Sequence, residues 1–127
     1  MASDKQDVTE IISRLILRVL NDHRSEENRI SRRDLKLQVS DLLGAAVGDR
    51  KLRDIMMTLR FDDPRGAWIC GSFKSGYYLA RDEDELNAFL RSDEHRARTL
   101  LARCAKQRKN AGLQNPAVMR LPLLIEN

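Results

Sequence analysis

The fold is decided by four consecutive stretches of sequence: ISRRDLKLQVSDLL (30–43), GAAVG (44–48), DRKLRDIMMTLR (49–60) and WICGSFKSGYYLA (68–80). The first and third predict short amphipathic helices, because apolar residues recur every three or four positions. Glycines at both ends of the second predict a turn between these helices. In the fourth, β-branched and aromatic residues flank GSFKSG, which predicts a β-hairpin. We expect Ile30 to form a short extended entry to the first helix.

Residues at the ends of the two helices support their bounds. Ser31 suits the N-cap of the first helix, with Asp34 in its first turn, and Gly44 suits its C-terminal end. Asp49 can cap the second helix. The spacing of apolar residues predicts the buried face of each helix: Leu35, Val39, Leu42 and Leu43 in the first, and Leu52, Ile55, Met56 and Leu59 in the second.

One helix is predicted before this stretch and another after it. Asp7 opens a capping-box pattern, and an apolar stripe at helical spacing follows as far as Leu20. Asp82 opens a second capping-box pattern, and no Gly or Pro follows until Gly112, so that one long helix or two joined near Ser92 both fit. The expected domains are a core over 1–91, a helical extension over 92–112 and a tail over 113–127.

Composition narrows the class of protein. The chain has 127 residues, of which 42% are hydrophobic and 33% charged, and it lacks an apolar run of about 18 residues, so we expect no membrane span. The polar start MASDKQD is unlike a secretory signal, and the two cysteines are far apart, so a reducing cytoplasm is expected. A net charge of +4 and a pI of about 9.4 mildly favour a polyanionic partner.

Three segments carry a family resemblance: LRDIMMTLR (52–60), WICGSFKSGYYLA (68–80) and the acidic DEDEL (82–86). Over residues 30–90 the chain resembles winged helix-turn-helix domains of bacterial and phage DNA-binding proteins, above all small ones whose hairpin ends in Gly-Tyr-Tyr-Leu-Ala. The resemblance implies an α+β, mainly α fold with a three-helix core plus a β-hairpin wing, a long C-terminal helix and an apolar tail. It implies that the extended Ile30 pairs with the hairpin. It also implies binding of double-stranded DNA, with helix 49–60 in the major groove. The turn over 44–48 is longer than the turn of the commonest helix-turn-helix domains. The orientation of helix 49–60 on DNA is therefore left open.

Basic and hydroxyl side chains on the expected outer surface are the DNA-binding candidates. Arginine can donate two hydrogen bonds to guanine, and lysine or arginine can hold phosphates. The candidates are Arg32, Arg33, Lys36, Arg50, Lys51, Arg53, Thr58 and Lys74. The alternative is a solvated helix face with internal salt bridges, for example between Arg50 and Asp54.

The aromatic residues and the cysteines have two interpretations each. Trp68, Tyr77 and Tyr78 could form a stacking platform for single-stranded bases, but packing of Trp68 and one tyrosine in the core is favoured. Cys70 and Cys104 are interpreted as small core residues rather than nucleophiles.

No catalytic constellation or phosphate-binding glycine loop is present in the sequence, so we expect neither enzyme activity nor a cofactor. The carboxylates at Asp62, Asp63 and 82–85 are interpreted as turn and cap chemistry, not as a metal site. The expected function is that of a non-enzymatic transcriptional regulator or replication accessory factor of phage or prophage type.

The C-terminal part has two interpretations. Its apolar residues could pair two copies of the chain into a homodimer, or they could fold back on the first helix. The tail could in addition bind another protein, which would make the chain a protein-interaction adaptor. The residues assigned to a dimer or partner surface are Leu86, Leu90, Leu100, Leu101, Leu121, Leu123 and Leu124.

Overall fold

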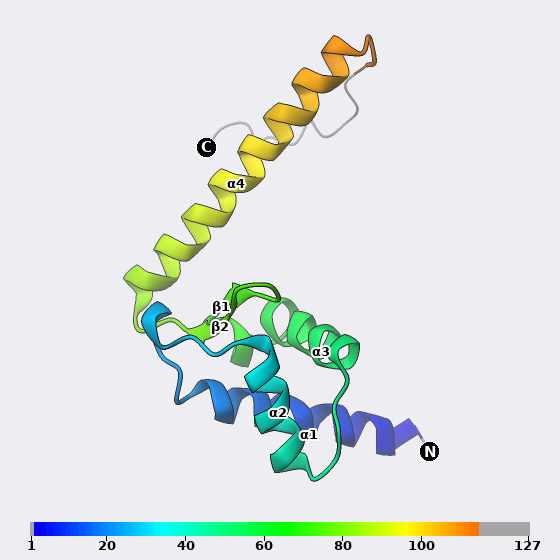
Figure 1. The fold of residues 1–127 in the computed structure, drawn as a ribbon, viewed down its shortest axis with the longest axis vertical. Helices are drawn as coiled ribbons and strands as arrows, with labels where there is room; N and C mark the ends of the chain where they lie inside the picture. Colours follow the sequence, from blue (N-terminus) through cyan, green and yellow to red (C-terminus); the bar gives the residue numbers. More distant parts are fainter. Residues whose placement is uncertain (1, 115–127) are drawn as a thin grey trace. The chain divides into compact units, whose positions relative to one another are not determined.

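The computed structural model describes residues 2–114, with side chains from Val8 onward (Figure 1). The described residues form these elements in order: α1 (Ala2–Leu20), η1 (Glu26–Asn28), α2 (Arg32–Leu43), α3 (Asp49–Asp62), η2 (Pro64–Gly66), β1 (Ile69–Ser72), β2 (Gly76–Leu79) and α4 (Glu83–Asn110). The expected α+β, mainly helical class is therefore confirmed at this level. The chain divides into two compact units, Met1–Leu86 and Asn87–Asn127. Within the described residues, no helix combines the length and the apolar character needed to cross a bilayer.

The core of the first unit lies where α1, α2, α3 and the hairpin meet. α1 contacts both α2 and α3, and it also contacts β2. The side chains buried in this cluster come from all of these elements: Ile12, Ile16, Val19, Leu20, Ile30, Leu35, Val39, Val47, Leu52, Ile55, Met56, Leu59, Ile69 and Tyr77. Each large apolar side chain buried in this way contributes about 1.5–3 kcal/mol to folding. The buried face predicted for α3 is confirmed in full.

In both α1 and α2, part of the predicted apolar stripe is exposed. Leu42 is about half exposed, because it lies in the last turn of α2 and only Leu35 and Val39 of that helix are buried. Ile11 is also exposed, because it sits about 100° around α1 from the buried Ile12. The spacing of apolar residues predicted the correct buried side of each helix but assigned too many residues to it.

The helix bounds differ from the predicted ones at two caps. α1 already includes Ala2, so the start predicted at Asp7 is wrong; the segment before it has no Gly or Pro to prevent a helix. The N-cap of α3 is the extended Gly48, so Asp49 is the first helical residue and not the cap. α4 is one unbroken helix, which excludes a joint near Ser92.

Other caps follow the sequence signals. The Ser31 hydroxyl accepts a hydrogen bond from the Asp34 amide at 3.1 Å, and Gly44 ends α2 in the left-handed region at φ 78°. At the start of α4, Asp82 Oδ1 accepts from the Glu85 amide at 2.9 Å. Glu85 in turn accepts from the Arg81 amide and from the hydroxyl of buried Ser25, which ties the loop after α1 to this cap.

The hairpin is held on both edges. β1 and β2 are antiparallel, with Gly71 opposite Tyr77. On the far side of β2, Ile30 exchanges two backbone hydrogen bonds with Tyr77, each 2.9 Å long, which confirms the predicted pairing of Ile30. Arg24 forms a second, parallel bridge with Leu79. On the far side of β1, the Arg60 guanidinium donates to the Gly71 carbonyl oxygen at 3.2 Å.

Candidate nucleic-acid interface

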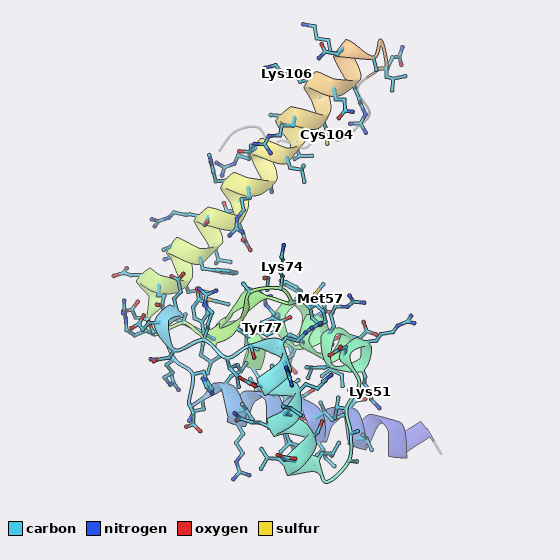
Figure 2. The ribbon with its side chains drawn as sticks, viewed as in Figure 1. Lys51, Met57, Lys74, Tyr77, Cys104 and Lys106 are labelled. Atoms are coloured by element: carbon cyan, nitrogen blue, oxygen red, sulfur yellow. The ribbon has the colours of Figure 1, made fainter. Side chains whose placement is uncertain are left out.

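The outer face of α3 carries the candidates predicted on that helix. Because Leu52, Ile55, Met56 and Leu59 are buried, the opposite side of the helix faces solvent. Arg50, Lys51, Arg53 and Thr58 are all exposed there. Figure 2 shows Lys51 and Met57 on α3, and Lys74 on the loop that joins the two strands. The salt bridge considered between Arg50 and Asp54 is not formed.

Phe73 at the tip of the hairpin brings three elements together. The Arg32 guanidinium of α2 lies 4.3 Å from the centre of its ring, and the Arg53 guanidinium of α3 lies 5.3 Å from it. Ser72 and Ser75 close the tip, since the Ser72 hydroxyl accepts from the Ser75 amide at 3.0 Å. The start of α2, the middle of α3 and the hairpin tip therefore form one continuous surface, which we call the Phe73 surface.

Asp49 joins the first turns of α2 and α3. Its carboxylate lies 3.1 Å from Lys36 Nζ and 3.8 Å from an Arg32 guanidinium nitrogen. Part of the charge of these two candidates is therefore neutralised. Among the described residues, the candidates with no ion pair are Arg33, Arg50, Lys51, Arg53 and Lys74.

A hollow of about 330 Å³ opens beside Phe73. It is lined by Ser31, Arg32, Arg33, Phe73 and Lys74. Three cationic side chains around one hollow favour an anionic group of phosphate size. The structure thus brings two of the three α2 candidates, Arg32 and Arg33, together with the hairpin candidate Lys74.

Two apolar side chains on α3 belong to this face and escaped the sequence-based prediction. Met57 is 51% exposed and Phe61 is 64% exposed. Met57 lies next to the candidate Thr58 in sequence, and apolar contacts of this kind can read the methyl group of thymine. Both residues are apolar but lie outside the apolar stripe of α3. That position in the sequence is the signal that could have identified them as exposed.

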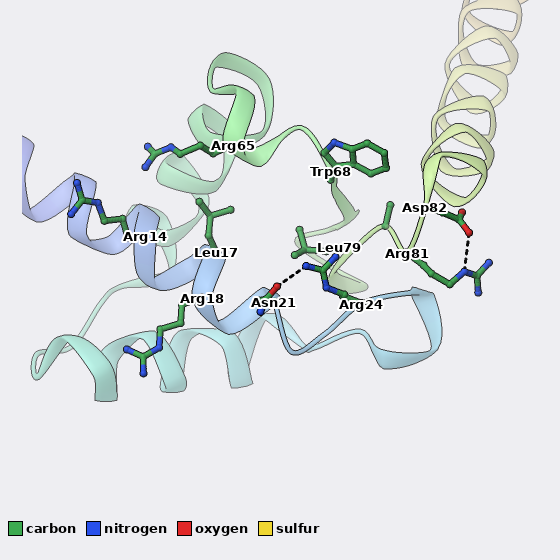
Figure 3. A pocket seen from close by; sticks show the side chains of 11 residues that line it. Arg14, Leu17, Arg18, Asn21, Arg24, Arg65, Trp68, Leu79, Arg81 and Asp82 are labelled. Atoms are coloured by element: carbon green, nitrogen blue, oxygen red, sulfur yellow. Dashed lines mark hydrogen bonds and ion pairs between the residues drawn. The ribbon is translucent and has the colours of Figure 1, made fainter.

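An arginine-rich groove lies at the open end of the hairpin (Figure 3). It is formed by the second half of α1, the turn that follows, and the residues just outside β1 and β2. Its cations are Arg14, Arg18, Arg24, Arg65 and Arg81. Trp68 projects beside it and is 43% exposed, so the expectation that Trp68 packs in the core is wrong. No sequence motif marked this groove, because its residues are scattered from 14 to 82.

The other aromatic candidates are buried. Tyr77 and Tyr78 have almost no exposed area, so neither can belong to a stacking platform. Burial raises the pKa of the Tyr77 hydroxyl and raises the pKa of Tyr78 to about 12. Cys70 is buried as expected, whereas Cys104 is exposed, which corrects its assignment to the core.

Arg65 holds together an exposed cluster of charges. Its guanidinium donates to both Glu10 oxygens, at 2.6 and 3.0 Å, and to Asp63 Oδ2 at 2.7 Å. Hydrogen bonds from Arg65 lower the pKa of Glu10 below its ordinary 4.5 and that of Asp63 below 3.8. Asp63 also accepts from the Arg65 amide at 2.9 Å, so its interpretation as turn chemistry is confirmed.

This cluster predicts a pH dependence of stability. Both carboxyl pKa values are lower in the folded chain than in the unfolded chain, so the cluster stabilises the fold above the unfolded values. That stability is lost as the pH falls through the folded values. The melting temperature of Arg65→Met is therefore expected to fall less between pH 7 and pH 3 than that of the parent, as measured by circular dichroism. Arg33→Met, which removes an unpaired charge, serves as the control, and an equal fall in all three proteins contradicts the prediction.

The dimer and partner candidates are only partly placed. Leu90 and Leu100 on α4 are exposed, and Leu86 and Leu101 are half-buried. Leu121, Leu123 and Leu124 lie outside the described residues. The homodimer and the adaptor function therefore stay predictions.

The described residues contain no group of three or more His, Cys, Asp or Glu side chains placed to hold a metal ion. No family model, no curated protein and no solved structure matches the chain.

Proposed function

We propose that residues 1–86 form a winged helix-turn-helix that binds double-stranded DNA, in a transcriptional regulator or replication accessory factor of phage or prophage type. The observation that carries the proposal is the Phe73 surface. Arg32 of α2, Arg53 of α3 and the hairpin tip meet around one ring, so that a duplex lying against α3 would also contact the hairpin tip.

The charges on this surface support contact with a duplex. Next to this surface, Arg50 and Lys51 lie in the first turn of α3, the part of a recognition helix that reaches base edges. Both are exposed, and neither has an ion pair among the described residues. Arg33 and Lys74 line the hollow beside Phe73 and could contact a backbone phosphate there. Binding is the whole mechanism: the cations release counterions from the backbone, and a few α3 side chains select the bases.

The salt dependence of binding tests the proposal. The full chain is titrated into a fluorescent 25-base-pair duplex of random sequence, and the anisotropy is followed at several NaCl concentrations. Each neutralised phosphate contributes about −0.9 to the slope of log K against log salt. We expect a slope between about −3 and −6, because some of the candidate cations are already paired with Asp49. A slope near zero, or no binding at low salt, contradicts the proposal.

Selection of bound fragments from random duplexes tests the sequence-reading part separately. If α3 reads bases, the selected fragments share a short motif, and a mismatch in the motif lowers the affinity by about 1–3 kcal/mol. If binding depends on salt but the fragments share no motif, the Phe73 surface binds only the DNA backbone, and α3 does not recognise bases.

A further inference from the structure

We propose that the arginine-rich groove is a second nucleic-acid site, which takes a single strand with one base stacked on Trp68. The groove has a volume of about 760 Å³ and is formed entirely within the first unit. It lies at the opposite end of the hairpin from Phe73, because Trp68 precedes β1 and Ala80 follows β2. The inference does not depend on duplex binding at the Phe73 surface.

Two of the five guanidinium groups are available for a ligand. Arg65 is held by Glu10 and Asp63, Arg14 lies 3.3 Å from Glu10, and Arg81 lies 3.2 Å from Asp82. Arg18 has no ion pair among the described residues. Arg24 donates only to the neutral amide oxygen of Asn21, at 2.6 Å, so its charge is oriented but not neutralised (Figure 3). Arg18 and Arg24 are therefore the groups that can hold phosphates.

Trp68 adds an exposed aromatic ring to the cations of the groove. Among the described residues, no guanidinium lies over the indole ring, and the indole N–H donates no hydrogen bond. Leu17 and Leu79 add apolar side chains to the lining of the groove. A half-exposed indole beside an apolar strip and free cations has the chemistry of a base-stacking site.

These features distinguish a single strand from the other polyanions. A duplex hides the faces of its bases in the stack, so it offers phosphates but no ring to Trp68. An acidic peptide offers carboxylates to Arg18 and Arg24 but leaves the indole without a partner. A single strand satisfies both parts of the groove at once.

The fluorescence of Trp68 tests the proposal directly, since it is the only tryptophan in the chain. The full chain is titrated with a dodecamer of deoxythymidine, with a blunt duplex and with poly-glutamate. Stacking is expected to quench the emission saturably with the dodecamer alone. If poly-glutamate competes for the groove with equal affinity, or if the dodecamer causes no quenching at low salt, the proposal is overturned.

Variants assign the binding to this groove. With a labelled dodecamer followed by anisotropy, Trp68→Ala is expected to weaken binding about tenfold or more, and Trp68→Phe to restore most of it. Arg18→Ala with Arg24→Ala is expected to lower the salt slope by about 1.4, or 0.7 for each lost phosphate contact.

Arg50→Ala with Lys51→Ala is the matched control for single-strand binding, because it removes two cations from α3 that do not line the groove. Circular dichroism confirms that each variant melts like the parent. If the α3 pair weakens single-strand binding and the groove pair does not, the single strand binds at the Phe73 surface and the inference fails.

Discussion

Replacing Arg50 and Lys51 together by alanine is expected to weaken duplex binding between about 30-fold and about 20,000-fold. Each lost base or phosphate contact removes about 1–3 kcal/mol. Both side chains are exposed and have no ion pair among the described residues, so their removal leaves no buried charge behind. The melting temperature is therefore expected to stay close to that of the parent.

This pair is preferable to one that includes Arg53. The Arg53 guanidinium lies over Phe73, so its removal would also disturb the hairpin tip. Lys106→Ala with Lys109→Ala removes the same net charge from α4 and serves as the control. Equal loss of affinity in both double variants shows that net charge alone drives binding, which contradicts a reading role for α3.

Gly76→Ala is expected to destabilise the first unit by at least about 3 kcal/mol, which lowers its melting temperature by about 10 °C or more. Gly76 has φ 96°, which costs a residue with a Cβ atom about 1–3 kcal/mol. The added Cβ would also lie 2.5 Å from the Ile30 carbonyl oxygen. The chain would have to move Ile30 away from β2 and lose its two hydrogen bonds with Tyr77.

Gly44→Ala separates these two effects. Gly44 has φ 78° but no atom within 4 Å of an added Cβ, so only the backbone strain remains and the loss should be about 1–2 kcal/mol. Thermal and urea unfolding of both variants provide the comparison. If Gly76→Ala melts no lower than Gly44→Ala, the pairing of Ile30 with β2 contributes nothing measurable to stability.

The parts of the fold that sequence could predict depend on short-range rules. The spacing of the four apolar residues of α3 places them on one side of the helix. A single orientation of the helix therefore buries all four, so their burial follows from spacing alone. Ser31 and Gly44 act on backbone groups within a few residues of themselves, and the same holds for Asp82. Ile30 was placed correctly through the resemblance rather than through any property of its own.

The candidate site was predicted less completely, because its contacts join residues far apart in the chain. Phe73 sits at a hairpin tip, where sequence offers no reason to expect a ring enclosed by arginines from two helices. Asp49 was assigned as a cap, yet it neutralises charges on α2. Trp68 was assigned to the core on residue type, although a residue just outside a strand can turn its ring to solvent.

The contact between Arg60 and Gly71 has a consequence for how copies of this chain can assemble. Tyr77 directs both of its backbone polar groups toward Ile30, so its partner Gly71 directs its own toward the other edge of the hairpin. At that edge the Arg60 guanidinium donates to the Gly71 carbonyl oxygen, which an added strand would need as a hydrogen-bond acceptor. A charged group at an open edge discourages growth of the sheet into cross-β aggregates. Addition of a strand from another copy is therefore disfavoured at this edge of the hairpin.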